Sequence, residues 1–188
     1  MPTKIMMIRH AEKPTDYPPV LGVKPSGDND KKSLSVRGWT RAGALAVLFA
    51  PTNGQFQNAA LATPNVIYAA HSSNGIDSSR VEETVTPLLD KLGANVQRNF
   101  DFTKGQEKEL MAVVLNQSGG VALVCWEHAL LVLAAHQIPL SDNNRTPVPT
   151  GWDDAVFDRV WVFDRDAQGN GYVFAEVGQR VLGGDEVI

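Results

Sequence analysis

The sequence predicts an α/β fold: a three-layer α/β/α sandwich with a central, mainly parallel sheet and a C-terminal hairpin at or near its edge. Short apolar runs alternate along the chain with longer segments of helical periodicity, which is the order of a parallel sheet covered on both faces. The last third instead has two apolar runs joined by a turn that contains Gly and Asn, a hairpin signal. The chain has 188 residues, 43 % of them hydrophobic, and no break in composition, so we expect a single domain over 1–188.

The expected strands are short apolar runs, as in sheets that are buried on both faces. The clearest is "VALVCW", and the first is followed at once by the charged stretch "RHAEK". The predicted strands are residues 3–8, 65–70, 96–100 and 121–126, with the hairpin over 159–177.

Four segments with helical spacing lie between these strands, at residues 35–50, 78–93, 104–120 and 128–137. Ser35 is a plausible N-cap of the first, and Pro51 ends it. In the second, Ser79 and Glu82 have the spacing of a capping box, and Gly93 is a stop signal.

Two segments, residues 15–34 and 139–155, are rich in Pro, Gly, Asn and Asp. This composition favours loops, and we expect both to be surface loops over one end of the sheet.

Charge and cysteine content exclude several classes of function. The net charge is −4 and the chain has no Lys/Arg cluster, which argues against a nucleic-acid partner. Cys125 is the only cysteine, so neither an intrachain disulfide nor a thiolate metal site can form. The longest apolar tract is interrupted by Glu127 and His128, so no membrane association is expected. The first ten residues lack the pattern of a signal peptide, and we expect a cytoplasmic protein.

Charged side chains follow two of the predicted strands. Arg9 and His10 come after the first, and Glu127 and His128 follow the strand over 121–126. Parallel strands end at the same edge of a sheet, which is where open α/β sheets bind ligands. Arg80 lies at the start of a helix, where free backbone N–H groups favour an anion. Together these residues predict a phosphate pocket.

Four motifs resemble, in order, those of the histidine phosphatase superfamily, which includes the phosphoglycerate mutases and many small phosphatases. "IRHAEKP" is similar to the Arg-His-Gly motif, with Ala11 in place of Gly as in "RHAEK"-type members. "LSVRGWTRAGAL" and "SSRVEETVTPLLDKLG" resemble the two helices that follow, and "VALVCWEH" resembles the strand that carries the second histidine. "WEHALL" departs from the usual pattern around that histidine, and the resemblance is weak beyond residue 138.

The resemblance implies a phosphoric monoester hydrolase with His10 as nucleophile, Arg9 and Arg80 as phosphate clamp and His128 as second pocket histidine. A neutral imidazole can carry a phosphoryl group as a covalent intermediate, and arginine forks stabilise its oxygens. We therefore expect neither a metal nor a cofactor. The expected partner is a phosphorylated small molecule or a phosphoprotein.

The family usually draws its proton donor from the segment between the arginine-bearing helix and the second histidine. Here that segment offers Asp101, Glu107 and Glu109. Asp101 is the first candidate because it follows a predicted strand, Glu107 is the second, and Glu127, adjacent to His128, is the third.

Other interpretations compete with this one. A phosphomutase of the same superfamily would need longer segments over the site, and a phosphate-binding module would have lost catalysis. Glu12 and Lys13 are expected to form a solvated rim, with Lys13 drawing in anionic substrate. His71 follows a predicted strand and could lie near the mouth of the site or at the surface, and His136 is expected at a boundary. Trp126 and Trp152 are expected to be packing residues, the latter with the alternative of lining the entrance.

Overall fold

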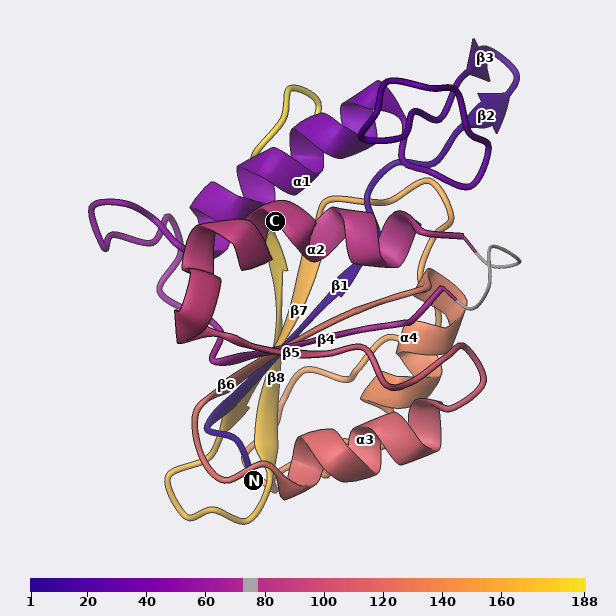
Figure 1. Ribbon diagram of the computed structural model, residues 1–188. Coiled ribbons are helices and arrows are strands. Elements are labelled where there is room, and N and C mark those ends of the chain that lie inside the picture. Colours follow the sequence, from indigo (N-terminus) through magenta and orange to yellow (C-terminus); the bar gives the residue numbers. More distant parts are fainter. Residues whose placement is uncertain (73–77) are drawn as a thin grey trace.

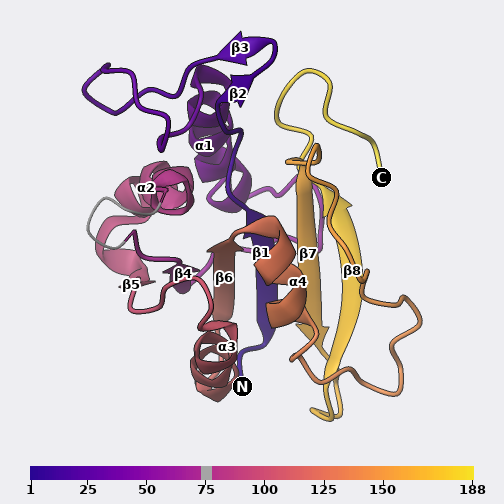
Figure 2. The same ribbon diagram turned by 90° about the vertical axis from the view of Figure 1, so that its right-hand side faces the viewer.

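The computed structural model describes residues 1–72 and 78–188 and contains one six-stranded sheet (Figure 1). The strands lie in the order β5-β4-β6-β1-β7-β8, as Figure 2 shows. The first four are mutually parallel, β7 is antiparallel to β1, and β8 pairs with β7. The bounds are β1 Lys4–Arg9, β4 Val66–Ala69, β5 Gln97–Asn99, β6 Val121–Trp126, β7 Arg159–Arg165 and β8 Tyr172–Gly178. The predicted mainly parallel sheet with its hairpin at the edge is confirmed.

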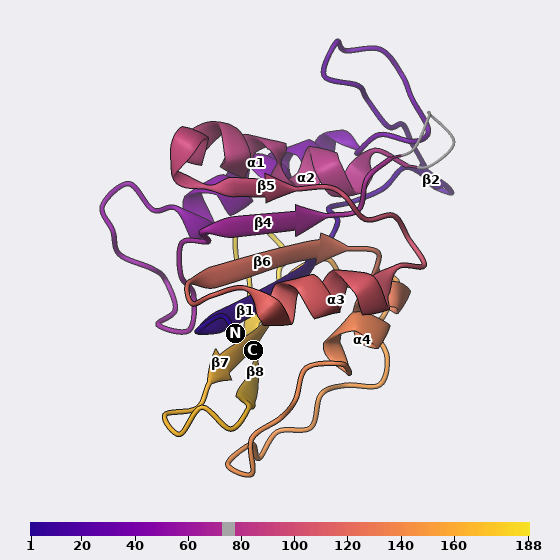
Figure 3. The ribbon, with the colours of Figure 1, turned by 60° about the horizontal axis from the view of Figure 1, so that its bottom comes forward.

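Four helices cover the two faces of the sheet and complete the predicted three layers. Helices α1 and α2 pack against each other on one face, and α3 and α4 pack on the other (Figures 1 and 3). Their bounds are α1 Val36–Phe49, α2 Arg80–Leu92, α3 Glu107–Asn116 and α4 His128–Ala135. No helix in the described part of the chain is long and apolar enough to cross a membrane.

The core lies along the central strands. Every residue of β1 from Ile5 to Arg9 is buried, and so is every residue of β6 from Ala122 to Trp126. A strand covered on both faces needs apolar side chains at successive positions, which explains the uninterrupted runs in the sequence. Because these strands are fixed by burial, the residues directly after them have well-defined positions.

The start of α1 is capped as predicted, but the start of α2 is not. The Ser35 hydroxyl accepts a hydrogen bond from Gly38 N at 3.1 Å. Ser79 makes no side-chain cap bond, because its hydroxyl donates to Glu83 Oε1 instead, and Glu82 accepts from Ser72 N. The predicted capping box is therefore wrong.

The two predicted loops differ in their course. Residues 15–34 are mostly exposed and include the short strands β2 (Thr15–Asp16) and β3 (Pro19–Val20). The loop over 139–155 does not stay at one end of the sheet, contrary to prediction. At one end of this loop, Ser141 N donates to Tyr172 O beside the amino end of β1. At the other end, Asp154 contacts Arg9 at the carboxyl end of β1. This loop therefore spans the length of the sheet.

Candidate active site

The carboxyl ends of β1 and β6 bring the two histidine-bearing turns together. Arg9 is paired with Trp126, and His10 N donates to Trp126 O at 3.0 Å. His10 thus follows β1 directly, while His128 is the first residue of α4, two positions beyond the end of β6. The two histidines lie at the same edge of the sheet.

The His10 ring is buried, with 5 % of the residue exposed, and its tautomer is fixed by the backbone. Nδ1 lies 2.7 Å from Ala11 O, and since a carbonyl oxygen only accepts, Nδ1 carries the proton. The lone pair is therefore on Nε2. Burial, and then the positive charges of Arg9, Arg80 and Lys104, lower the pKa of His10 to about 3. At neutral pH this imidazole is an uncharged base, the form in which it can attack phosphorus.

Arg9 is held by a segment from the C-terminal part of the chain. Its Nη1 donates to the carbonyl oxygens of Asp154 at 2.7 Å and Val156 at 3.1 Å, and its Nη2 donates to Asp154 Oδ1 at 3.0 Å. The guanidinium also lies 3.8 Å from the ring centroid of Phe157. We call residues 153–157 the strap, because their backbone oxygens, the Asp154 carboxylate and the Phe157 ring contact the Arg9 guanidinium.

Arg80 begins α2, but its guanidinium is turned towards the loop that precedes α1. Nη2 donates to Lys31 O at 2.6 Å, and Nε donates to Ser33 O at 3.4 Å. The charge of Arg80 still acts on His10, whose pKa it lowers. The sequence correctly predicted that Arg80 lies at the start of a helix, but it did not predict that the guanidinium would donate to these carbonyl oxygens.

His128 lies between two carboxylates. Its Nδ1 lies close to a carboxylate oxygen of Glu127, and its Nε2 is 3.4 Å from Asp154 Oδ1. Burial, and next the charge of Arg9, lower the pKa of His128, while the two carboxylates oppose this shift. The side chain keeps 20 % of its surface exposed, so a ligand can reach it.

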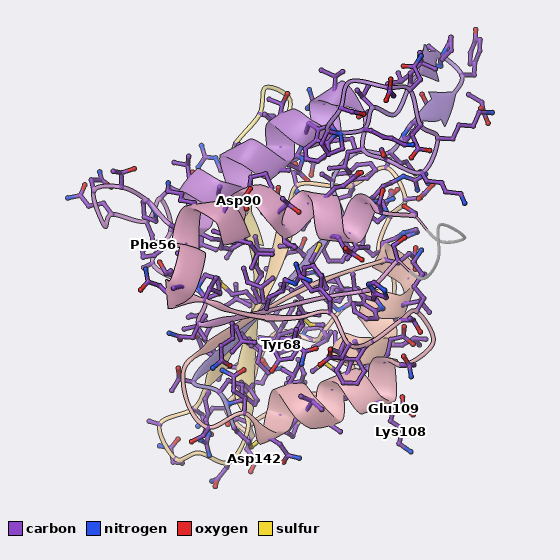
Figure 4. All side chains as sticks on the ribbon, in the orientation of Figure 1. Phe56, Tyr68, Asp90, Lys108, Glu109 and Asp142 are labelled. Carbon is purple, nitrogen blue, oxygen red and sulfur yellow. The ribbon has the colours of Figure 1, made fainter. Side chains whose placement is uncertain are left out.

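The candidate proton donors have very different surroundings. Glu107 is buried and accepts hydrogen bonds from Trp126 Nε1 and Gly105 N, both at 2.9 Å. Glu127 is the N-cap of α4 and accepts from Leu130 N. Asp101 is exposed, and within residues 1–72 and 78–188 its carboxylate makes no ion pair or hydrogen bond with either histidine. Figure 4 shows Glu109 projecting from α3 into solvent.

Sequence reasoning missed Lys104, Asp154 and Phe157, which all act on His10 or Arg9. Each of these residues lies in a loop. The adjacent carboxylates Asp153 and Asp154 were the signal in the sequence that the strap could contact a cationic side chain. Trp152 was correctly predicted as a packing residue, since its ring lies 4.8 Å from that of Trp161.

Glu12 is not part of a solvated rim, contrary to prediction. Arg41 Nη2 donates to Glu12 Oε1 at 2.9 Å and to Asp185 Oδ1 at 2.7 Å, and the side chains of Arg41 and Asp185 are almost completely buried. The ion pairs tie the turn after His10 to α1 and to the C-terminal residues. Sequence reasoning could not find this network, because its members are far apart along the chain.

Helix α1 approaches the same turn with its backbone. A Cβ atom at Gly38 would lie 2.4 Å from Glu12 O and 3.1 Å from Glu12 N. No side chain fits in this space without moving the backbone two residues after His10.

A groove of about 520 Å³ opens beside the site. The apolar side chains of Val20, Ala155 and Phe157 line it, and Lys13 and Asp154 also contribute to its wall. Phe157 connects the groove with the buried centre, because its ring is also 6.2 Å from that of His10. No cluster of potential metal ligands is found in the described ranges.

No family model matches the sequence, and a search of curated proteins finds no match. Solved structures do resemble it. A protein from Agrobacterium tumefaciens assigned as the phosphohistidine phosphatase SixA is 14 % identical, with 93 % of this chain and 97 % of that chain covered at a TM-score of 0.50. A protein from Escherichia coli K-12 assigned as an alpha-ribazole-5'-P phosphatase is 13 % identical, with 96 % of each chain covered at a TM-score of 0.52. The chain therefore shares the fold of these two solved structures.

Proposed function

We propose that this protein is a phosphatase of the histidine phosphatase superfamily, which hydrolyses a phosphate monoester through a phosphohistidine intermediate. The observation that carries the proposal is the state of His10: a buried, uncharged imidazole with its lone pair on Nε2, at a sheet edge shared with His128. Three cations, Arg9, Arg80 and Lys104, act on this imidazole and favour its uncharged form.

The proposed reaction has two steps. His10 Nε2 attacks phosphorus, the bond from phosphorus to the leaving oxygen breaks, and that oxygen takes a proton from a carboxylic acid, for which we propose Asp101. Water then attacks phosphorus, its proton returns to the carboxylate, and the bond from phosphorus to Nε2 breaks. Arg9, Arg80 and His128 stabilise the charge on the non-bridging oxygens.

Asp101 is proposed because the other two candidates are already engaged. Glu107 accepts from Trp126 and Gly105, and Glu127 caps α4 beside His128. The residue after Asp101 is anchored near the end of β4, since His71 N donates to Phe102 O at 2.8 Å. This contact holds the Asp101 turn at the edge of the sheet where β1 and β6 end.

The proposal includes a reaction without a metal ion, on a phosphorylated small molecule or phosphoprotein. It also includes a single domain over 1–188, which the six-stranded sheet supports, and a cytoplasmic location, which the lone buried Cys125 supports.

Rapid-quench trapping with a ³²P-labelled monoester tests the proposal. In a strong chelator, the wild-type protein should carry label that is lost in acid and kept in base, and His10→Ala should carry none while keeping its circular dichroism spectrum. Activity that disappears with the chelator and returns with a divalent ion would contradict the proposed mechanism.

A further inference from the structure

Three nitrogen atoms from two parts of the chain, the segment of Arg9 and Lys13 and the start of α4, converge on one oxygen of Asp154. Asp154 Oδ1 lies 3.0 Å from Arg9 Nη2, 3.0 Å from Lys13 Nζ and 3.4 Å from His128 Nε2. The groups of Arg9 and Lys13 are permanently charged, and Arg9 directly precedes the proposed nucleophile. A terminal oxygen of a bound phosphate would require the same surroundings, since arginine forks bind carboxylates and phosphates alike.

The strap also occupies Nη1 of Arg9, whereas Nε has no hydrogen-bond partner among the described residues. Nη1 donates to carbonyl oxygens of Asp153, Asp154 and Val156, and the Arg9 side chain has no exposed surface. A phosphate that binds Arg9 Nη2 must therefore displace the Asp154 carboxylate from it.

This displacement is physically accessible. The Asp154 side chain is 62 % exposed, so its carboxylate is rehydrated when it leaves, and partly exposed ion pairs contribute little to stability. The contact with Lys13 lowers the pKa of Asp154, so the carboxylate is charged at neutral pH. Asp154 thus brings one negative charge and two carboxylate oxygens to the position beside Arg9 and Lys13.

We propose that the Asp154 carboxylate is an internal competitor for the phosphate position and that it determines which anions bind there. This inference rests on the proposed function. A monoester dianion brings two charges and three terminal oxygens to Arg9, Lys13 and His128, and so gains more than the carboxylate that it displaces. A monoanionic phosphate diester brings one charge, and the carboxylate excludes it.

Calorimetric titration at pH 8 tests the inference, with inorganic phosphate and dimethyl phosphate as probes. Asp154→Ala should bind phosphate about tenfold more tightly than the wild-type protein, which corresponds to about 1.4 kcal/mol of lost competition. It should also bind dimethyl phosphate, which the wild-type protein should not bind measurably.

Asp153→Asn is the matched control. It removes one charge from the same strap, but the Asp153 carboxylate accepts only from Ala155 N among its described contacts, a bond that Asn can keep. It should tighten phosphate binding by less than about threefold, as expected of a screened surface charge. Thermal unfolding of each variant checks that the fold is retained.

The outcomes separate the inference from the proposed function. Unchanged or weaker phosphate binding by Asp154→Ala would overturn the inference, because Asp154 would then be neutral or would support the site. An equal gain in both variants would also overturn it, because any charge on the strap would have the same effect. No binding of phosphate by any of the three proteins would overturn the inference and the proposed function together.

Discussion

Arg9 and Asp154 are 145 positions apart and are joined twice, by Nη2 to the carboxylate Oδ1 at 3.0 Å and by Nη1 to the backbone oxygen at 2.7 Å. The first residue belongs to a buried central strand, and the second to an exposed part of the strap. This pair therefore connects the rigid centre of the sheet to a segment that has few apolar contacts to hold it, so motion at the site is expected in the strap and not in β1.

Replacement of Arg80 tests the phosphate clamp. Arg80→Ala removes charge-assisted hydrogen bonds worth about 1.5–3 kcal/mol each, so kcat/KM should fall by at least about tenfold. Arg80→Lys should restore part of the loss, since a single ammonium cannot reproduce the fork. Steady-state kinetics on an aryl phosphate measure both. A kinetically silent Arg80→Ala would mean that its bonds to Lys31 and Ser33 are its only role.

Replacement of Asp101 tests the proton donor. Asp101→Asn should slow hydrolysis of alkyl phosphates about 10²-fold or more and that of aryl phosphates far less, because aryl leaving groups need little protonation. Glu109→Gln is the control, since this carboxylate lies on the solvent side of α3 (Figure 4) and should affect neither substrate. Equal losses on both substrates for Asp101→Asn would exclude it as the donor.

The low pKa of His10 predicts acid sensitivity. Between pH 6.5 and about 3 the unfolded chain binds a proton at this histidine that the folded protein does not bind, so the free energy of unfolding falls as the pH falls. From pH 7 to pH 5 the wild-type protein should lose about 2 kcal/mol more than His10→Gln does. Urea unfolding at both pH values measures this. The opposite sign would mean that the folded protein holds His10 charged.

The buried ion pairs of Arg41 predict a large loss of stability on replacement. Arg41→Met leaves the carboxylates of Glu12 and Asp185 without their main partner, which should lower the free energy of unfolding by about 3–5 kcal/mol. Arg37→Met is the control. Arg37 also pairs with Glu12, but about half of its side chain is exposed, so the loss should stay within about 1 kcal/mol. Similar losses in both variants would contradict the importance of burial.

The sequence was sufficient to predict the sheet and the positions of both histidine-bearing turns. Continuous apolar runs such as β6 predict buried strands, and because β1 and β6 do form a parallel pair, His10 and His128 lie at the same edge. The cap at Ser35 was predictable for a similar reason, because its partner Gly38 is only three residues away.

The features that the sequence did not predict have a common physical cause: these side chains bind partners from other parts of the chain and not their neighbours in sequence. The sequence around Ser79 favours a capping box, but Glu82 accepts from Ser72 and pairs with His71 instead. Glu12 has the composition of a surface residue and is drawn inside by Arg41. Asp154 lies in a loop whose course depends on packing along the whole sheet, so no local pattern could place it beside Arg9.

The close approach of Gly38 to Glu12 has a consequence for mutational scanning. In a selection for activity, every substitution at position 38 should be depleted as strongly as substitutions of His10, although glycine has no group that could take part in the reaction. Any added Cβ would press on the Glu12 carbonyl and shift the turn that carries the proposed nucleophile. Depletion at this position would therefore reflect the close contact between the backbones of α1 and of the turn after His10. The glycine of "LSVRGW" is then as characteristic of this site as a chemically reactive side chain.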